Sequence, residues 1–204
     1  MIPNALLSAT LLRIEQRKEL AEIFGFETRN KYAVALEDGK DLLYIAEQQK
    51  SALGFLVRQI LGHWRSFTLT CFDANRQPVC EAKHPFRFYF HELNVTGERG
   101  EPLGSMVRRF SILSKKFDVL TPDGRVALTV NSPIWKIWTF RFFDGSRERA
   151  VIRKKWGGVL REAILDADKF ELEFLDPTID PNLRMVLTVA CAFVDLMYFE
   201  KKAN

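Results

Sequence analysis

The hydrophobic pattern near the C-terminus predicts a helix that is buried on all sides. Residues 185–199 read MVLTVACAFVDLMYF and place apolar side chains on every face of a helix, so the helix must be enclosed by lipid or by its own protein. The run would extend about 22 Å, whereas the hydrocarbon core of a bilayer is about 30 Å thick. It also contains Asp195, and a carboxylate in mid-membrane would cost about 2.5–3.5 kcal/mol. We therefore predict a core helix over about residues 181–200.

The same segment carries signals for where the helix begins. Asp180 can act as the N-cap, and Pro181 suits the first helical position. Asp195 is the one ionisable group that we expect to be buried, and a buried carboxylate needs a hydrogen-bond donor. A partner on a strand or loop is the expected arrangement, although a functional role for this carboxylate stays open.

Upstream of this helix, the pattern changes to short strand-like segments separated by hairpin signals. The hairpin signals are Asp38-Gly39, Asp123-Gly124 and Asp144-Gly145. Residues 67–79 and 117–128 also resemble each other and suggest a repeated unit. A twisted antiparallel sheet of roughly ten or more strands closes on itself or splits. We predict a single mainly-β domain over residues 1–204, a closed barrel threaded by the apolar helix.

One segment departs from the strand pattern. Residues 48–67 place apolar side chains at helical spacing and carry three cations but no acidic residue. The sequence predicts an amphipathic helical insertion over about residues 50–65, which either packs on the barrel or lies in a membrane interface. In the second case the membrane-contact residues are Leu53, Leu56, Ile60 and Trp64.

Charge is distributed unevenly along the chain. The net charge is +4, but residues 83–161 hold 16 lysine and arginine residues against 7 acidic ones. A basic segment of this kind suits an anionic partner such as lipid headgroups or nucleic acid, and a solvated sheet surface explains it equally well. The three cysteines include no CxxC pair, which favours reduced thiols inside a cell, and the N-terminus has no signal-peptide pattern. A cytoplasmic location is expected.

Several stretches resemble the phospholipid scramblase family, whose domain is related to the tubby C-terminal domain. The clearest are GFETRNKYAV at 25–34, KKWGGVLREAILDADKFELEF at 154–174 and ACAFVDLMYFEK at 190–201. The resemblance implies a closed antiparallel β-barrel of twelve strands around a central hydrophobic C-terminal helix. It also implies calcium-dependent, energy-independent movement of phospholipids between leaflets.

Calcium is the one cofactor that the resemblance implies. Asp166 and Asp168 match the first two liganding positions of the family's calcium segment. The chain departs from that segment at Glu171, where a small residue is expected, and at Pro177, where an acidic residue is expected. The alternation of apolar and acidic residues is also typical of a strand with its carboxylates facing water.

A second departure concerns membrane attachment. Animal members carry a cysteine cluster that accepts palmitate, and the corresponding region here reads KHPFRFYFHEL at 83–93. Membrane contact would then depend on apolar surface and basic residues. Besides the 50–65 segment, the aromatic run from Trp135 to Phe143 is a candidate. Most of that run is expected in the core, with at most one of Trp135 and Trp138 at an interface.

No motif for enzyme chemistry is found. The sequence has no GxSxG, GxxxxGK[ST], GxGxxG or HExxH pattern, and its histidines, His63, His84 and His91, have no metal-ligand spacing. We expect no catalytic site and interpret the histidines as structural or solvent-facing.

Together these features favour a scramblase-like protein that acts peripherally at the inner face of the membrane. The residues expected to attract anionic phospholipids are Arg108, Arg109, Arg153, Lys154 and Lys155. Two alternatives remain open: a non-catalytic, tubby-like module that binds a lipid or another ligand, and a scaffold that binds nucleic acid or protein through the same basic face. Oligomeric state is not indicated by the sequence.

Overall fold

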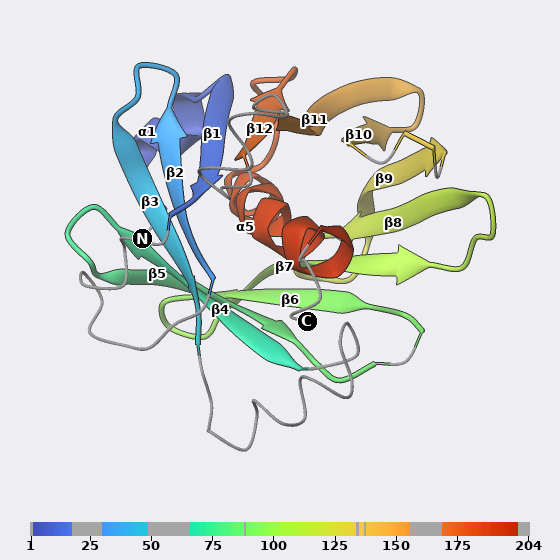
Figure 1. Ribbon diagram of the computed structural model, residues 1–204, viewed down its shortest axis with the longest axis horizontal. Coiled ribbons are helices and arrows are strands. Elements are labelled where there is room, and N and C mark those ends of the chain that lie inside the picture. The colour runs from blue at the N-terminus through green and yellow to red at the C-terminus, as the bar shows by residue number, and fades with distance from the viewer. Residues whose placement is uncertain are drawn as a thin grey trace, which may run out of the picture.

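The computed structural model describes residues 2–17, 30–48, 66–87, 89–133, 135–136, 138–155 and 169–199. The described residues form twelve antiparallel strands in one closed barrel, with neighbours in chain order and β1 paired to β12 (Figure 1). The strands are β1 (Leu11–Gln16), β2 (Lys31–Leu36), β3 (Asp41–Glu47), β4 (Phe67–Asp73), β5 (Pro78–His84), β6 (Glu92–Gly97), β7 (Pro102–Arg109), β8 (Ser114–Leu120), β9 (Val126–Pro133), β10 (Thr139–Asp144), β11 (Arg147–Lys155) and β12 (Lys169–Phe174).

The barrel encloses the C-terminal helix α5 (Pro181–Tyr198), as Figure 1 shows. Every residue from Met185 to Val194 is fully buried. Among the described helices, α5 alone has the length and composition of a membrane span, and 83% of it is buried inside the protein. The predicted barrel around a hydrophobic C-terminal helix is therefore confirmed.

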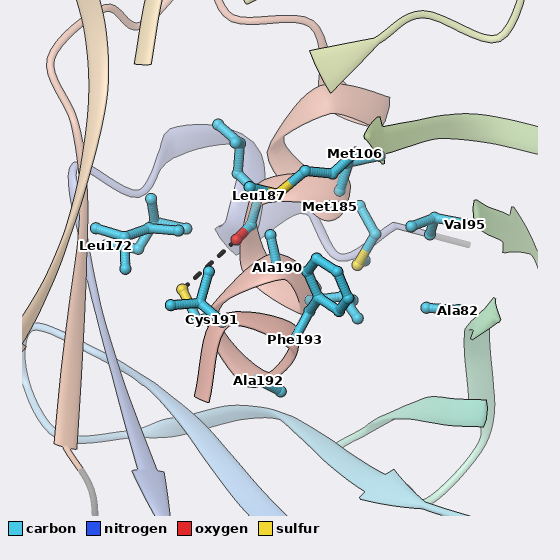
Figure 2. Packing of buried hydrophobic residues seen from close by; sticks show 14 of the residues in the cluster. Ala82, Val95, Met106, Leu172, Met185, Leu187, Ala190, Cys191, Ala192 and Phe193 are labelled. Atoms are coloured by element: carbon cyan, nitrogen blue, oxygen red, sulfur yellow. Dashed lines mark hydrogen bonds between the residues drawn. The ribbon is translucent and has the colours of Figure 1, made fainter. Parts of the chain in front are cut away.

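Local hydrogen bonds satisfy several polar groups at the start of α5 and along it. The Asp180 carboxylate accepts hydrogen bonds from the backbone N–H groups of Asn182 and Leu183, as expected of an N-cap. Further along, the Cys191 thiol bonds to the carbonyl oxygen of Leu187 at 3.5 Å, and apolar side chains surround it (Figure 2). These local bonds let the helix bury all of its faces.

The two ends of the barrel differ. Tight turns join β2 to β3, β4 to β5, β6 to β7, β8 to β9 and β10 to β11, and we call this the turn end. The opposite end, which we call the loop end, holds the strand ends that adjoin the other connections, between β1 and β2, β3 and β4, β5 and β6, β7 and β8, β9 and β10, and β11 and β12. Because strands alternate in direction, α5 begins at the turn end and finishes at the loop end.

A buried arginine closes the turn end. Arg184 donates hydrogen bonds to the carbonyl oxygens of Leu6, in the short helix α1 (Asn4–Ser8), and of Ala9, at 3.2 and 2.8 Å. Its guanidinium lies 4.3 Å from the centre of the Phe174 ring. Burial lowers the pKa of Arg184, while the nearby Asp176 raises it. The expectation that Asp195 is the one buried ionisable group was wrong, because Arg184 and Asp176 are also buried.

Close approach of backbone elements requires glycine at one position of β7. Gly104 has a φ of +140°, and a Cβ placed there would lie 2.5 Å from the Leu120 carbonyl oxygen and 3.3 Å from a methyl group of Val186 on α5. A side chain at this position would therefore clash with β8 and with the central helix.

We predict that Gly104→Ala lowers the free energy of unfolding by about 3 kcal/mol or more, because both the backbone angle and the contacts are unfavourable. Gly124→Ala is the matched control: Gly124 also has a positive φ, of +82°, but has no atom within 4 Å of its Cβ position. This control should lose about 1 kcal/mol. Urea denaturation measures both values, and equal losses would contradict the proposed contact.

Candidate functional site

Three of the five predicted lipid-binding cations face outward and are paired with acidic side chains of neighbouring strands. Arg109 Nε lies 2.6 Å from Asp118 Oδ2. On β11, Arg153 pairs with Glu173 and Lys155 pairs with Glu171, both on β12. The last two pairs form a surface of alternating charge along β11 and β12, and all three compensate positive charge locally.

The other two predicted cations, Arg108 and Lys154, face inward. Arg108 is the register partner of the buried Phe117, and residues opposite each other in a sheet share a face. Its charge also reaches Tyr198 near the end of α5, where it lowers the pKa of the phenol against the larger, raising effect of burial. The five residues therefore do not form one outward patch, because alternation along each strand separates them.

Lys154 lies over a group of aromatic rings where α5 ends. Its Nζ is 4.2 Å from the centre of the Phe199 ring, and Trp138 stacks on Phe199 at 5.2 Å with an interplanar angle of 12°. The ring of Phe170 lies 5.7 Å from the same ammonium group. These are cation–π distances, so the aromatic cluster holds a positive charge just inside the loop end.

A further cation at this end, Lys115, was missed by the sequence analysis. Its Nζ is 4.1 Å from the centre of the Phe140 ring and donates a hydrogen bond to the carbonyl oxygen of Lys136 at 3.1 Å. Lys115 is 5% exposed, and burial lowers its pKa to about 8. The alternation in SKKFDVL carried a signal for it, since Lys115 shares a strand face with the apolar Phe117 and Val119, whereas Lys116 shares a face with Asp118.

Two buried histidines lie at the adjoining ends of β5 and β6. His84 Nδ1 lies 2.7 Å from the carbonyl oxygen of Glu92, and His84 Nε2 lies 3.4 Å from His91 Nδ1. The His84 ring also packs against Phe193 of α5, with ring centres 5.6 Å apart. Within the described residues no cluster of three or more potential metal ligands occurs. Both histidines are structural wall residues, as one of the two interpretations predicted, while His63 lies outside the described residues.

Asp195 is buried, as predicted. It is 2% exposed, and its Oδ2 accepts a hydrogen bond of 2.8 Å from the hydroxyl of Tyr32 on β2. The bond joins the central helix to the barrel wall near the loop end. This is the expected arrangement of a helix carboxylate bonded to a strand.

The loop end carries a set of exposed apolar side chains, which we call the apolar rim. They lie on three successive connections of one barrel wall, between β5 and β6, β7 and β8, and β9 and β10. The rim consists of Phe86, Tyr89, Phe90, Phe110, Ile112, Leu113 and Trp135, with exposed fractions between 43% and 80%. Among the described residues, the other large exposed hydrophobic side chains are Val126 and Leu175, and both lie at the turn end.

The rim connections are also basic. The connections 85–91, 110–113 and 134–138 contain Arg87 and Lys136 and no aspartate or glutamate, and the adjoining strand ends of β7 and β8 add Arg109, Lys115 and Lys116. The turn-end segments contain nine acidic and five basic residues; these segments are 37–40, 73–77, 98–101, 121–125, 144–147 and 175–180. The described barrel therefore presents an apolar, positive end and a polar, acidic end.

The aromatic run of the sequence analysis divides between core and rim. Phe140 and Phe142 are at most 1% exposed and lie in the core, whereas Phe143 is only partly buried, so fewer of the run lie in the core than expected. Trp135 is 72% exposed, whereas Trp138 is partly buried against Phe199, in line with at most one of the two lying at an interface.

The remaining predicted site residues lie outside the described residues. These are the membrane-contact residues Leu53, Leu56, Ile60 and Trp64, together with the predicted insertion over about 50–65, and the calcium candidates Asp166 and Asp168. The first group is flanked by β3 and β4, and the second by β11 and β12. In both cases the strand ends next to these residues lie at the loop end. In β12 itself, Phe170, Leu172 and Phe174 face the core, while Glu171 and Glu173 form the ion pairs described above.

The lowered pKa of Lys115 predicts a specific pH dependence of stability. Below about pH 8 the side chain is charged in both the folded and the unfolded chain. Between about 8 and the ordinary value of 10.5 the folded protein has released the proton while the unfolded chain still holds it, so stability rises with pH. Urea denaturation from pH 7 to 10 measures the free energy of unfolding of the wild type and of Lys115→Met. Above about pH 8, this free energy should rise more for the wild type than for the variant. A constant difference would contradict the burial of this charge.

A family sequence model and the similar curated proteins point to the same family. A sequence model described as Scramblase matches residues 2–201. Human phospholipid scramblase 1 is 29% identical over 94% of this chain and 63% of its own length. Human phospholipid scramblase 2 is 27% identical over 94% of this chain and 68% of its own length. The chain thus spans 60–63% of the length of the mammalian phospholipid scramblase 1 proteins that it matches.

A solved structure supports the fold alone. The X-ray structure of an Arabidopsis thaliana protein aligns with a TM-score of 0.52 at 12% identity, and the alignment covers 96% of this chain and 98% of that one. The architecture is therefore shared at low sequence similarity. Because the Scramblase sequence model matches residues 2–201, nearly the whole chain, this protein belongs to the scramblase family.

Proposed function

We propose that this protein binds anionic phospholipid bilayers peripherally, with the loop end of its barrel facing the headgroups, and promotes energy-independent movement of lipids between leaflets. The observation that carries the proposal is the polarity of the barrel: cations without acidic residues lie at the rim connections, and acidic residues predominate at the turn end. The inner, cytoplasmic leaflet is the surface that suits this polarity, because it carries the anionic lipids. Membership of the scramblase family supports a lipid-related role.

The structure changes which cations we expect to matter most. Arg153 and Lys155 face the acidic side chains of β12, so a membrane would have to compete with existing ion pairs. Lys116 and Lys136 are both exposed; Lys136 belongs to a rim connection, and Lys116 lies near the start of β8 beside one. We therefore assign to them a larger part of the attraction, and Arg108, Lys115 and Lys154 add a positive field from inside the loop end.

The proposed lipid movement involves no bond chemistry and no path through the barrel. α5 fills the interior, since the residues from Met185 to Val194 have no exposed surface. A phospholipid would therefore have to cross at the protein's outer surface, where a bound barrel disturbs the order of the nearby lipids. The filled interior equally favours a second candidate, a lipid-binding module that moves no lipid.

The competing nucleic-acid role is less well supported by the charge distribution. The cations of β11 that could follow a phosphate backbone, Arg153 and Lys155, are already paired with carboxylates. Nucleic-acid sites combine a continuous positive surface with stacking side chains.

Binding that is equally strong to neutral and anionic vesicles, or absent from both, would overturn the membrane proposal.

The electrostatic part can be tested with a charge-matched pair of variants. We predict that Lys116→Gln with Lys136→Gln weakens binding to vesicles containing phosphatidylserine by about 2 kcal/mol, or roughly thirtyfold, because each lysine near an anionic surface contributes about 1 kcal/mol. The control, Lys40→Gln with Arg76→Gln, removes the same charge from exposed turn-end positions and should bind like the wild type. Co-sedimentation at several salt concentrations measures both, and equal losses would indicate a net-charge effect only.

Lipid movement needs a separate experiment. Protein incorporated into or bound to vesicles with a fluorescent lipid in both leaflets should increase the fraction bleached by external dithionite, with or without calcium. An unchanged fraction in the presence of bound protein would remove translocation and leave the lipid-binding role.

A further inference from the structure

The apolar rim is the feature that lipid attraction by charge does not explain. Its side chains project from three successive hairpin connections, and several of them are among the most exposed large hydrophobic residues described: Tyr89 is 80%, Ile112 77% and Phe110 76% exposed. Folded proteins rarely leave grouped apolar surface in water unless it contacts a partner or a membrane.

We propose that the apolar rim is a membrane-insertion edge: its side chains enter the headgroup and upper acyl region of an anionic bilayer while the cations of the same connections remain at the phosphates. This inference rests on the proposed membrane function and assigns to it a site outside the 50–65 segment. The occupant that it names is the surface of an anionic phospholipid bilayer.

The composition of the rim fits this occupant. Tryptophan, tyrosine and phenylalanine favour the interfacial layer of a bilayer, since their rings are large and apolar. Trp135 and Lys136 are adjacent in the chain and both exposed, and Phe110 follows the exposed Arg109. Lysine and arginine beside inserted apolar residues can extend to the headgroups. The connections themselves hold no acidic residue, and a surface of one charge sign suits an anionic bilayer.

The position of the rim also suits a shallow contact. The connections lie at the end of the barrel, beyond the last paired residues of the strands, so insertion exposes no strand edge to lipid. Interfacial elements typically enter about 5–10 Å. The barrel and the enclosed helix can then remain folded while the rim enters the bilayer.

A triple substitution tests the rim without changing charge. Phe110→Ser, Ile112→Ser and Leu113→Ser together should lower the partition coefficient onto phosphatidylserine-containing vesicles by about tenfold or more, because apolar burial is lost. The salt dependence of the remaining binding should stay as in the wild type. The matched control is Val126→Ser with Leu175→Ser, which removes exposed apolar side chains from the turn end and should bind like the wild type. Thermal unfolding confirms that each variant is folded.

A fluorescent probe reports insertion directly. The native cysteines, Cys71, Cys80 and Cys191, are each at most 3% exposed, so a thiol dye can be attached selectively to Ile112→Cys or, as control, to Val126→Cys. On anionic vesicles the probe at 112 should shift to shorter emission wavelengths and be quenched by a quencher attached to the upper acyl chain. The probe at 126 should show neither change.

The outcomes separate the possible failures. Wild-type protein that binds anionic vesicles, with a triple variant that binds equally well and an unquenched probe at 112, would overturn the insertion edge and leave the proposed function intact. Wild-type protein that does not bind at all would overturn both. A wild-type dimer that the triple variant abolishes, without lipid contact at 112, would assign the rim to a second copy of the chain and overturn the proposal.

Discussion

The mutual burial of α5 and the inward faces of the twelve strands is the interaction on which the rest of the structure depends. A helix with apolar residues on all sides cannot stay in water, and a barrel of this size would be hollow without a core element. The strands shield the helix from water, and the helix fills the barrel; accordingly, the residues from Met185 to Val194 are fully buried. Polar contacts fix the helix along the barrel axis, since Arg184 is bonded at the turn end and Asp195 to Tyr32 nearer the loop end.

This filled interior decides where partners can act. Because α5 occupies the interior, we expect contact with a lipid surface on the outside of the barrel or at one of its ends. The turn end is acidic and closed by α1 and Arg184, whereas the loop end joins cations to exposed apolar side chains. The asymmetry follows from the antiparallel topology, which collects the short turns at one end and, among the described connections, those of the apolar rim at the other. The proposed membrane role of the loop end therefore depends on a difference in charge and apolar exposure between the two ends, which the strand topology creates.

Much of the architecture could be predicted from sequence because its determinants are local. The apolar run, the Asp180-Pro181 start and the Asp-Gly hairpins are short-range patterns, and the structure confirms the helix and the barrel. The site was less predictable, because strand register decides it. Arg153 and Lys154 are neighbours in sequence, yet one pairs with Glu173 outside and the other lies over Phe199 inside.

The apolar rim was missed for a related reason. A stretch such as HPFRFYF has the composition of a strand, and only the three-dimensional structure shows that Phe86, Tyr89 and Phe90 lie on an exposed connection. The amphipathic helical insertion over about 50–65, with its alternatives of packing on the barrel or contacting a membrane, and the calcium residues Asp166 and Asp168 stay predictions. Both belong to connections whose flanking strands have the adjoining ends at the loop end.

Hydrogen exchange of the protein bound to anionic vesicles tests the central claim most directly. If α5 stays enclosed, the amides of residues 183–197 and of the surrounding strands β7 and β12 should remain as protected on vesicles as in solution. Loss of protection in the strands while α5 stays protected would contradict the account, because it would mean that the helix has left the barrel for the bilayer.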